Sequence, residues 1–143
     1  MEWNKNEYTV STDQARLNID YLHQFLSNTY WAKGIPVEIL KKSIAGAVCF
    51  GVYHERRQVG FARVITDKAT FGYLADVFID PDYRGRGLSK WLMECVMNHP
   101  DLQGFRRFML ATRDAHGLYR QFGFTGVPNP EIMMQIHRPD VYQ

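Results

Sequence analysis

Residues 77–89 have the sequence Val77-Phe78-Ile79-Asp80-Pro81-Asp82-Tyr83-Arg84-Gly85-Arg86-Gly87-Leu88-Ser89. The stretch begins as an apolar strand, and a helical pattern begins at Leu88. The two glycines leave backbone N–H groups open to an anion, and a helix that starts there adds unsatisfied amides and a partial positive charge. Arg84 and Arg86 add charge at the same place. The sequence therefore predicts an anion site at this strand-turn-helix junction.

Other glycine-rich phosphate loops fit this turn less well. A Walker A loop needs Gly-Lys-Ser/Thr after a four-residue spacer, and a dinucleotide-binding loop needs a third glycine where Lys90 stands. From this motif alone, the remaining alternative to an anion site is an ordinary exposed turn with two solvated arginines.

Hydrophobic periodicity extends the prediction outward from the turn. Helices are expected at 12–27, where Ser11 to Gln14 have the form of a capping box, at 36–46, at 88–98 and at 115–122. Strands are expected at 7–10 on an edge and at 47–53, 58–66, 71–79, 107–112 and 132–136. The pattern predicts one α/β domain (mixed α+β) over residues 1–143. Its mixed sheet of six to seven strands contains an antiparallel meander and a strand-helix-strand crossover, with four helices.

Composition limits the classes of partner. The chain has 143 residues and a net charge of +2, which does not favour nucleic acid or a membrane surface. The N-terminus has no apolar signal-like run, and nowhere do 18 apolar residues follow one another. Cys49 and Cys95 lie in apolar runs without metal-ligand spacing and are expected to be buried and reduced. We therefore expect a cytoplasmic protein.

Two motifs resemble those of the GNAT superfamily of N-acetyltransferases. Residues 84–89 resemble its Gln/Arg-x-x-Gly-x-Gly/Ala motif, with Ser89 in place of the usual Gly or Ala. Residues 115–124 resemble its Ala-x-x-x-Tyr-x-x-x-Gly-Phe ending, and Thr112 stands where the family usually has Asn. The resemblance extends from about residue 8 to about residue 136 and implies the GNAT-like fold.

The resemblance implies acetyl-CoA as co-substrate and no metal. The turn's backbone would bind the pyrophosphate, and the pantetheine arm would lie in a gap beside the preceding strand. The residues expected to contact the cofactor are Val77, Phe78, Ile79, Arg84, Gly85, Arg86, Gly87, Leu88, Ser89 and Thr112.

The implied reaction is direct attack of a primary amine on the thioester. By resemblance, Tyr119 is the general acid, although it also shares a core-like helix stripe. Asp76, a carboxylate in an apolar strand, is the candidate base, with His116 as the alternative. Tyr30 and Trp31 lie where the family builds one wall of the acceptor site, and plain packing is the other interpretation.

Two other functions are compatible with the residues. A non-catalytic acyl-CoA-binding or sensor domain would keep the turn without a productive acid or base. Nucleic-acid binding through the scattered arginines is disfavoured by the balanced charge. The sequence does not identify the acceptor amine, which is a small molecule or a peptide. It also leaves open whether the chain forms a homodimer.

Overall fold

One six-stranded sheet forms the centre of the computed structural model, which describes residues 1–143. The strands are β1 (Glu2–Lys5), β2 (Tyr8–Ser11), β3 (Val48–His54), β4 (Arg57–Thr66), β5 (Phe71–Ile79) and β6 (Arg107–Leu110), and they lie in sequence order. Only β5 and β6 are parallel, and every other neighbouring pair is antiparallel. The predicted meander and the strand-helix-strand crossover are therefore confirmed.

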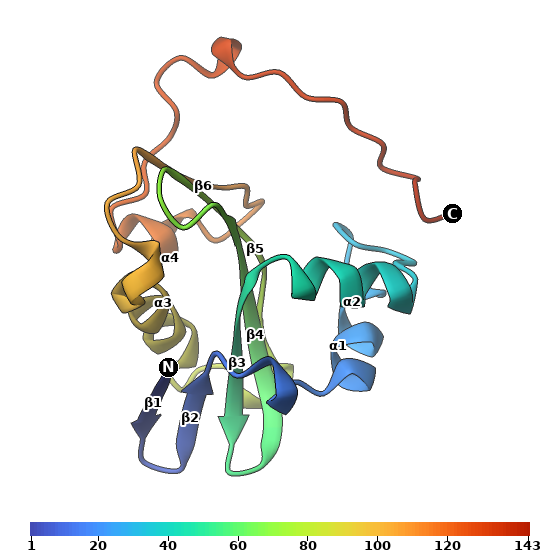
Figure 1. Ribbon diagram of the computed structural model, residues 1–143, viewed down its shortest axis with the longest axis vertical. Helices are drawn as coiled ribbons and strands as arrows, with labels where there is room; N and C mark the ends of the chain where they lie inside the picture. The colour runs from blue at the N-terminus through green and yellow to red at the C-terminus, as the bar shows by residue number, and fades with distance from the viewer.

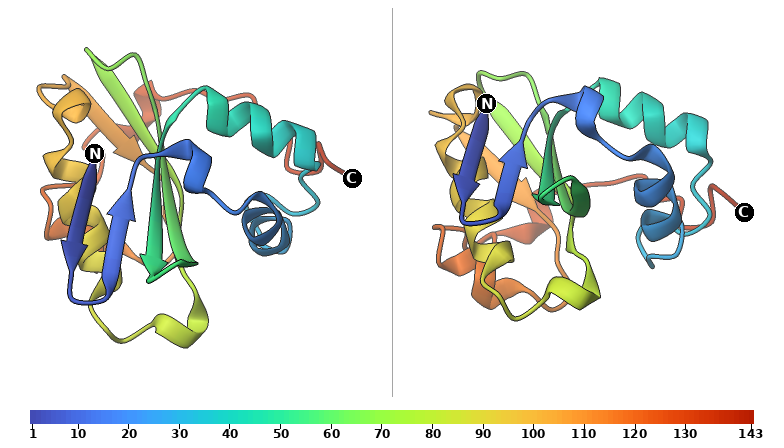
Figure 2. Two further views of the ribbon diagram at one scale, coloured as in Figure 1. Left: turned by 60° about the horizontal axis from the view of Figure 1, so that its bottom comes forward. Right: turned by 90° about the horizontal axis from the view of Figure 1, so that it is seen from below.

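Helices cover both faces of this sheet. The four α-helices are α1 (Ile19–Leu26), α2 (Val37–Ala45), α3 (Leu88–Asn98) and α4 (His116–Arg120). Figures 1 and 2 show α1 and α2 on one face and α3 and α4 on the other. Each layer encloses its own hydrophobic cluster, one reaching from the sheet to α3 and the other to α1 and α2. Burial of these apolar stripes fixes the helices against the sheet.

The N-terminal helix is shorter than the sequence predicted. The chain forms a 3-10 turn at Gln14–Arg16, and α1 begins only at Ile19, because Leu17 is extended and Asn18 caps the helix. The Asn18 side chain accepts a hydrogen bond from the Tyr21 N–H at 3.0 Å. The predicted capping box is wrong: the Ser11 hydroxyl oxygen instead accepts from the Asp13 N–H at 3.1 Å.

Two strand predictions are also corrected. The strand predicted at 7–10 is β2, but it lies between β1 and β3 and is not an edge. The edge strand on that side of the sheet is β1, which is short and polar and carries no alternating pattern. The last strand predicted at 132–136 does not form, because this segment leaves the sheet after a 3-10 turn at Pro130–Ile132.

Both cysteines are free and buried, as predicted. Burial raises the pKa of each thiol to about 12, so neither is a thiolate near neutral pH. None of the helices combines the length and apolar character needed to cross a membrane.

Candidate functional site

The carboxyl half of β5 separates from β6. Pairing between them runs from Phe71–Arg107 to Leu74–Leu110, and β5 then continues to Ile79 with no partner on that side. On the other side β4 stays paired, but between the pairs Phe61–Phe78 and Arg63–Ala75 strand β5 carries one extra residue. This β-bulge bends and twists the strand, which opens the splay where the sequence predicted the cofactor gap.

Asp76 lies in this bulge with a backbone φ of +55°, a conformation that costs a non-glycine residue free energy. Its carboxylate accepts a hydrogen bond from Arg63 Nε at 2.8 Å and another from Trp31 Nε1 at 2.8 Å. Only 8% of the Asp76 side chain and 14% of the Arg63 side chain are exposed. The bulge is thus held by a largely buried ion pair and fixes the Trp31 ring.

At the end of β5, Gly85 and Gly87 adopt left-handed backbone angles of +79° and +77°. A Cβ added at either position would meet no protein atom within 4 Å, so the angle, and not crowding, requires glycine there. Six successive N–H groups, from Gly85 to Lys90, donate no hydrogen bond within the chain, and the first helical bond runs from the Trp91 N–H to the Gly87 oxygen. The turn and the start of α3 therefore present a continuous set of free donors to an anion.

The two arginines of the turn are held by neutral groups. Arg84 Nε donates to the Ile79 carbonyl at 3.1 Å, and Arg86 donates to the Tyr8 hydroxyl at 2.9 Å while lying 4.8 Å from the Tyr83 ring centroid. Neither forms a salt bridge with a carboxylate. Their positive charges remain available beside the free N–H groups.

The three apolar residues before the turn divide between the two faces. Val77 and Ile79 pack into the cluster under α3, whereas the Phe78 ring belongs to the opposite cluster and stacks on Phe25 at 3.8 Å. The backbone of Phe78, and not its ring, therefore lies along the gap between β5 and β6. Leu88 is similarly buried, and its side chain belongs to the cluster under α3.

Tyr119 lies in α4 with 8% of its surface exposed. Its ring packs edge-on against Phe124, with 6.0 Å between the centroids. No hydrogen bond from a protein group acts on its hydroxyl, and burial, followed by the nearby Asp114 charge, raises the pKa of that phenol above its ordinary value. The side chain is therefore a protonated, unpaired donor. Thr112, expected to contact the cofactor, accepts the Ala115 N–H through its own hydroxyl oxygen at 3.0 Å.

Tyr30 and Trp31 form an exposed aromatic pair, edge-to-face at 5.0 Å. The Arg113 guanidinium lies 3.6 Å from the Tyr30 ring centroid. Because Trp31 is also bonded to Asp76, the loop after α1, the bulge of β5 and the loop after β6 meet here. The structure thus joins Tyr30 and Trp31 to Asp76, and adds Arg113 and Arg63, which sequence reasoning did not select.

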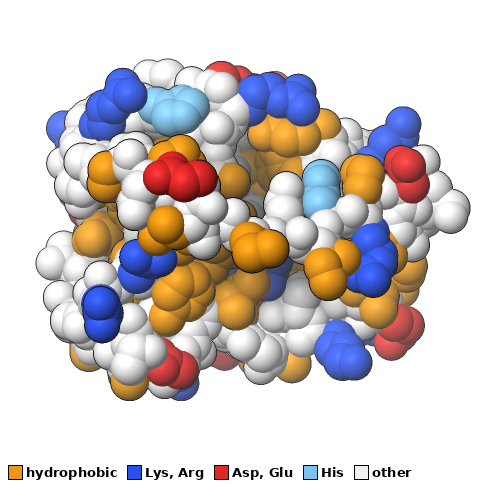
Figure 3. Space-filling view, turned by 90° about the horizontal axis from the view of Figure 1, so that it is seen from above, with side chains coloured by type: hydrophobic (Ala, Val, Ile, Leu, Met, Phe, Trp, Pro, Cys, Tyr) orange, Lys and Arg blue, Asp and Glu red, His pale blue; other side chains and the backbone are white.

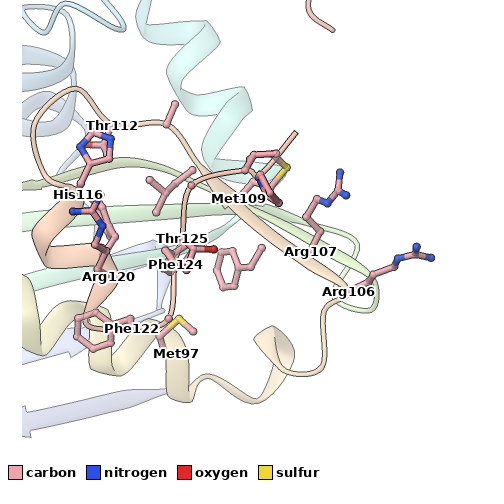
Figure 4. Close-up of a pocket in the computed structure, with 18 of the residues that line it drawn as sticks. Met97, Arg106, Arg107, Met109, Thr112, His116, Arg120, Phe122, Phe124 and Thr125 are labelled. Carbon is pink, nitrogen blue, oxygen red and sulfur yellow. The ribbon is translucent and has the colours of Figure 1, made fainter. Parts of the chain in front are cut away.

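Two hollows lie beside the candidate cofactor-binding and catalytic residues. A small one of about 100 Å³ lies at the turn and is lined by Ile79, Tyr83, Arg84, Gly85, Gly87, Leu88 and Ser89. A larger one of about 710 Å³ lies beside β6 and α4 and includes Thr112, His116 and Tyr119, but no residue of β5 (Figure 4). The small hollow coincides with the predicted pyrophosphate site. His116 is exposed at the start of α4 and belongs to the larger space, apart from Asp76.

A family model described as an acetyltransferase (GNAT) domain matches residues 45–126. This chain belongs to the GNAT acetyltransferase family. A Gibberella zeae protein named as an acetyltransferase is 36% identical over 140 residues, which cover 82% of this chain and 78% of that protein.

Solved GNAT structures show the same fold. A Xanthomonas campestris GNAT-family structure is 53% identical, covers 94% of this chain and 96% of that one, and superposes with a TM-score of 0.92. A GNAT acetyltransferase from Elizabethkingia anophelis, solved with acetyl-CoA bound, is 14% identical over 85% of this chain and 78% of that one, with a TM-score of 0.64. At that identity the likeness concerns the GNAT fold alone.

Proposed function

We propose that this GNAT protein transfers the acetyl group of acetyl-CoA to a primary amine by direct attack. The observation that carries the proposal is the run of six unpartnered N–H groups from Gly85 to Lys90 at the mouth of the β5–β6 splay. Free amides at a helix start bind phosphate groups, and the splay leaves strand backbone exposed for an extended ligand. Both features suit a pyrophosphate joined to a pantetheine arm.

Acetyl-CoA supplies the reactive thioester when bound. The turn, with Arg84 and Arg86 beside it, would hold the pyrophosphate, and the backbone of residues 77–79 would lie along the pantetheine arm. A backbone N–H of that segment would stabilise the oxyanion of the tetrahedral intermediate. These roles use main-chain groups, so the buried side chains of Phe78 and Leu88 need no contact with the cofactor.

Proton transfer would be shared by two side chains. An amine with a solution pKa of roughly 10 must lose a proton before it attacks. Asp76 lies in the bulge beside the splay, and each carboxylate oxygen keeps a further lone pair beyond the bonds from Arg63 and Trp31. We assign it as base. Tyr119, protonated and without a hydrogen-bond partner in the chain, would donate its proton to the departing thiolate.

The aromatic pair Tyr30 and Trp31 would form the acceptor wall. Arg113 stacks on Tyr30 without an acidic partner, which favours acceptors that carry a carboxylate or another anionic group near the amine. We therefore assign selection of the acceptor to the positive charge of Arg113 at this wall.

The test is a panel of amines assayed with acetyl-CoA by release of free thiol. At least one amine is expected to accelerate release above hydrolysis, and Tyr119→Phe should lower kcat by roughly 100-fold while acetyl-CoA binding is unchanged. The matched control is Tyr73→Phe, which removes a hydroxyl from the part of β5 that stays paired with β6. Because the pKa of Tyr119 is raised, the hydroxyl keeps its proton above pH 10, so its ionisation should limit kcat only above that pH.

Tight acetyl-CoA binding without acceleration by any amine would instead support a sensor. If an amine is acetylated and Tyr119→Phe leaves kcat intact, the assigned acid is wrong, although acetyl transfer stands.

A further inference from the structure

Helix α1 and the loop after it contact the carboxyl half of β5 and its end at three points, which we call the α1 brace. Strand β5 runs from the end of the molecule that Figure 3 looks down on, where hydrophobic side chains gather over the middle, to the turn at the opposite end (Figure 1). The three contacts pair Tyr21 with Asp80, Phe25 with Phe78, and Trp31 with Asp76. The α1 brace therefore supports the half of β5 that β6 leaves unpaired, from the bulge to the turn.

Asp80 forms the end of the α1 brace nearest the turn. Its Oδ1 accepts a hydrogen bond from the Asp82 N–H at 3.0 Å, and its Oδ2 accepts one from the Tyr21 hydroxyl at 3.0 Å. Its own N–H donates to the Val59 carbonyl at 2.7 Å, just beyond the last β4–β5 pair. Asp80 thus caps the 3-10 turn at Pro81–Tyr83, which leads directly into the residues with free N–H groups.

The Asp80 carboxylate has no cationic partner, although it lies close to a predicted anion site. No lysine, arginine or histidine forms a salt bridge with it, and only two neutral groups, the Asp82 N–H and the Tyr21 hydroxyl, donate to it. A carboxylate that turned toward a bound pyrophosphate would repel it. The hydrogen bond from Tyr21 therefore keeps one oxygen of this carboxylate against α1.

Tyr21 is suited to hold that oxygen. Its side chain is half-buried, and burial, followed by the hydrogen bond to Asp80, raises the pKa of Tyr21 above its ordinary value. The hydroxyl thus stays protonated and remains a donor. Leu22 and Leu26 on the same helix are buried in the cluster under α1 and α2, so the donor stands on a fixed support.

We propose that Tyr21 positions the turn through Asp80, an inference that rests on the proposed binding of acetyl-CoA. Four residues separate Asp80 from Gly85, and the Asp80 carbonyl also accepts the Tyr83 N–H at 2.8 Å. A shift of Asp80 is therefore passed to the backbone that presents its N–H groups to the pyrophosphate. Neither Tyr21 nor Asp80 lines the hollow at the turn, so Tyr21 acts without touching the cofactor.

The first experiment measures the Kd of acetyl-CoA by calorimetry, which needs no acceptor. Tyr21→Phe removes only the hydroxyl and should weaken binding about fivefold, because the turn loses a hydrogen bond to a charged group. Tyr142→Phe is the matched control, since Tyr142 packs on the same cluster but its hydroxyl bonds no group of the chain. Its Kd should equal that of the wild type.

Three outcomes would count against this role. A wild-type chain that does not bind acetyl-CoA would overturn the proposed function and the role of Tyr21 with it. If the wild type binds and Tyr21→Phe binds equally well, only the role of Tyr21 is wrong. A Tyr21→Phe protein with a lower free energy of unfolding in urea and an unchanged Kd would make Tyr21 a purely structural residue.

The second experiment tests whether Tyr21 acts through Asp80. Asp80→Ala removes both the cap and the contact with α1 and should weaken acetyl-CoA binding about tenfold. Adding Tyr21→Phe to Asp80→Ala should then change the Kd less than twofold, because the hydroxyl has nothing left to hold. A further fivefold loss in that background would overturn the proposal.

Asp80→Asn is the conservative variant. Its amide oxygen can still accept from the Asp82 N–H, and its NH₂ group can donate to the Tyr21 oxygen. Acetyl-CoA should therefore bind to Asp80→Asn no more weakly than to the wild type. Binding as weak as that of Asp80→Ala would contradict a role based on these two hydrogen bonds.

Discussion

The two ends of the β5–β6 splay are built in different ways. At the turn, the functional groups are main-chain amides of consecutive residues, from Gly85 to Lys90. At the bulge, they are side chains from four separate segments, namely Trp31, Arg63, Asp76 and Arg113. The turn depends on local backbone geometry, whereas the bulge depends on the tertiary fold.

This difference gives a rule for substitution. Where the backbone binds, a change of backbone angle should matter more than the loss of a side-chain charge. Where side chains hold one another, the loss of one charge should disturb both the chemistry and the fold. Substitutions at the turn and at the bulge should therefore differ in both the size and the kind of their effects.

Asp76→Asn should have the largest effect. Loss of the carboxylate removes the assigned base, and we expect kcat to fall by roughly 100-fold with the acetyl-CoA KM unchanged. The same change leaves Arg63 without a charged partner in a largely buried pair, so the free energy of unfolding should fall by about 3 kcal/mol. Steady-state kinetics and urea denaturation measure the two effects.

The matched control is Glu2→Gln. Glu2 and Arg16 also meet at 2.8 Å, but their side chains are 51% and 35% exposed, so the change should cost less than about 1 kcal/mol. An Asp76→Asn protein with normal kcat and reduced stability would show that Asp76 only positions Trp31 and Arg63.

Gly87→Ala should have the next largest effect. An alanine at a φ of +77° costs roughly 1–2 kcal/mol, and the turn relieves this strain by moving its N–H groups. The acetyl-CoA KM should then rise roughly tenfold, with kcat changed far less. Gly117→Ala is the control, because Gly117 has no positive φ and an added Cβ there also meets open space. Equal acetyl-CoA KM values for the two variants would contradict a role of the turn in binding the cofactor.

The same contrast explains what the sequence predicted. The turn, the start of α3 and the crossover were predicted because glycine spacing and helical periodicity are local signals. Arg63 was missed as the partner of Asp76, since the bulge that brings them together arises from the β4–β5 register. Arg113 was not selected either, because its stacking on Tyr30 depends on two loops far apart in sequence.

The C-terminal segment, residues 130–143, shows the limit of local pattern. Alternation of apolar residues predicted a strand at 132–136, and the structure has no strand there. A strand requires a neighbouring backbone, and no periodicity within one segment specifies which backbone that is. The break at Leu17 and Asn18 has the opposite origin, since a local cap interrupted a longer apolar pattern.

Arg113→Gln should have a smaller and more selective effect. If Arg113 pairs with an anionic group of the acceptor, its loss should raise the KM of acidic amines by about fivefold and leave neutral amines unaffected. Arg56→Gln, an exposed arginine in the β3–β4 turn, controls for net charge. A uniform rise for acidic and neutral amines would indicate that Arg113 only stabilises Tyr30.

Arg84→Gln and Arg86→Gln should have the smallest effects. Each guanidinium is exposed and already bonded to a neutral group, Arg84 to the Ile79 carbonyl and Arg86 to the Tyr8 hydroxyl, so it adds charge but does not shape the turn. We expect the acetyl-CoA KM to rise about threefold in each, with kcat unchanged, as for weak solvent-screened charge contacts. The increase should shrink at high salt, because salt already screens the wild-type contact. If kcat falls instead and KM does not change, these side chains take part in the reaction, and the contrast between a backbone-built turn and a side-chain-built bulge is wrong.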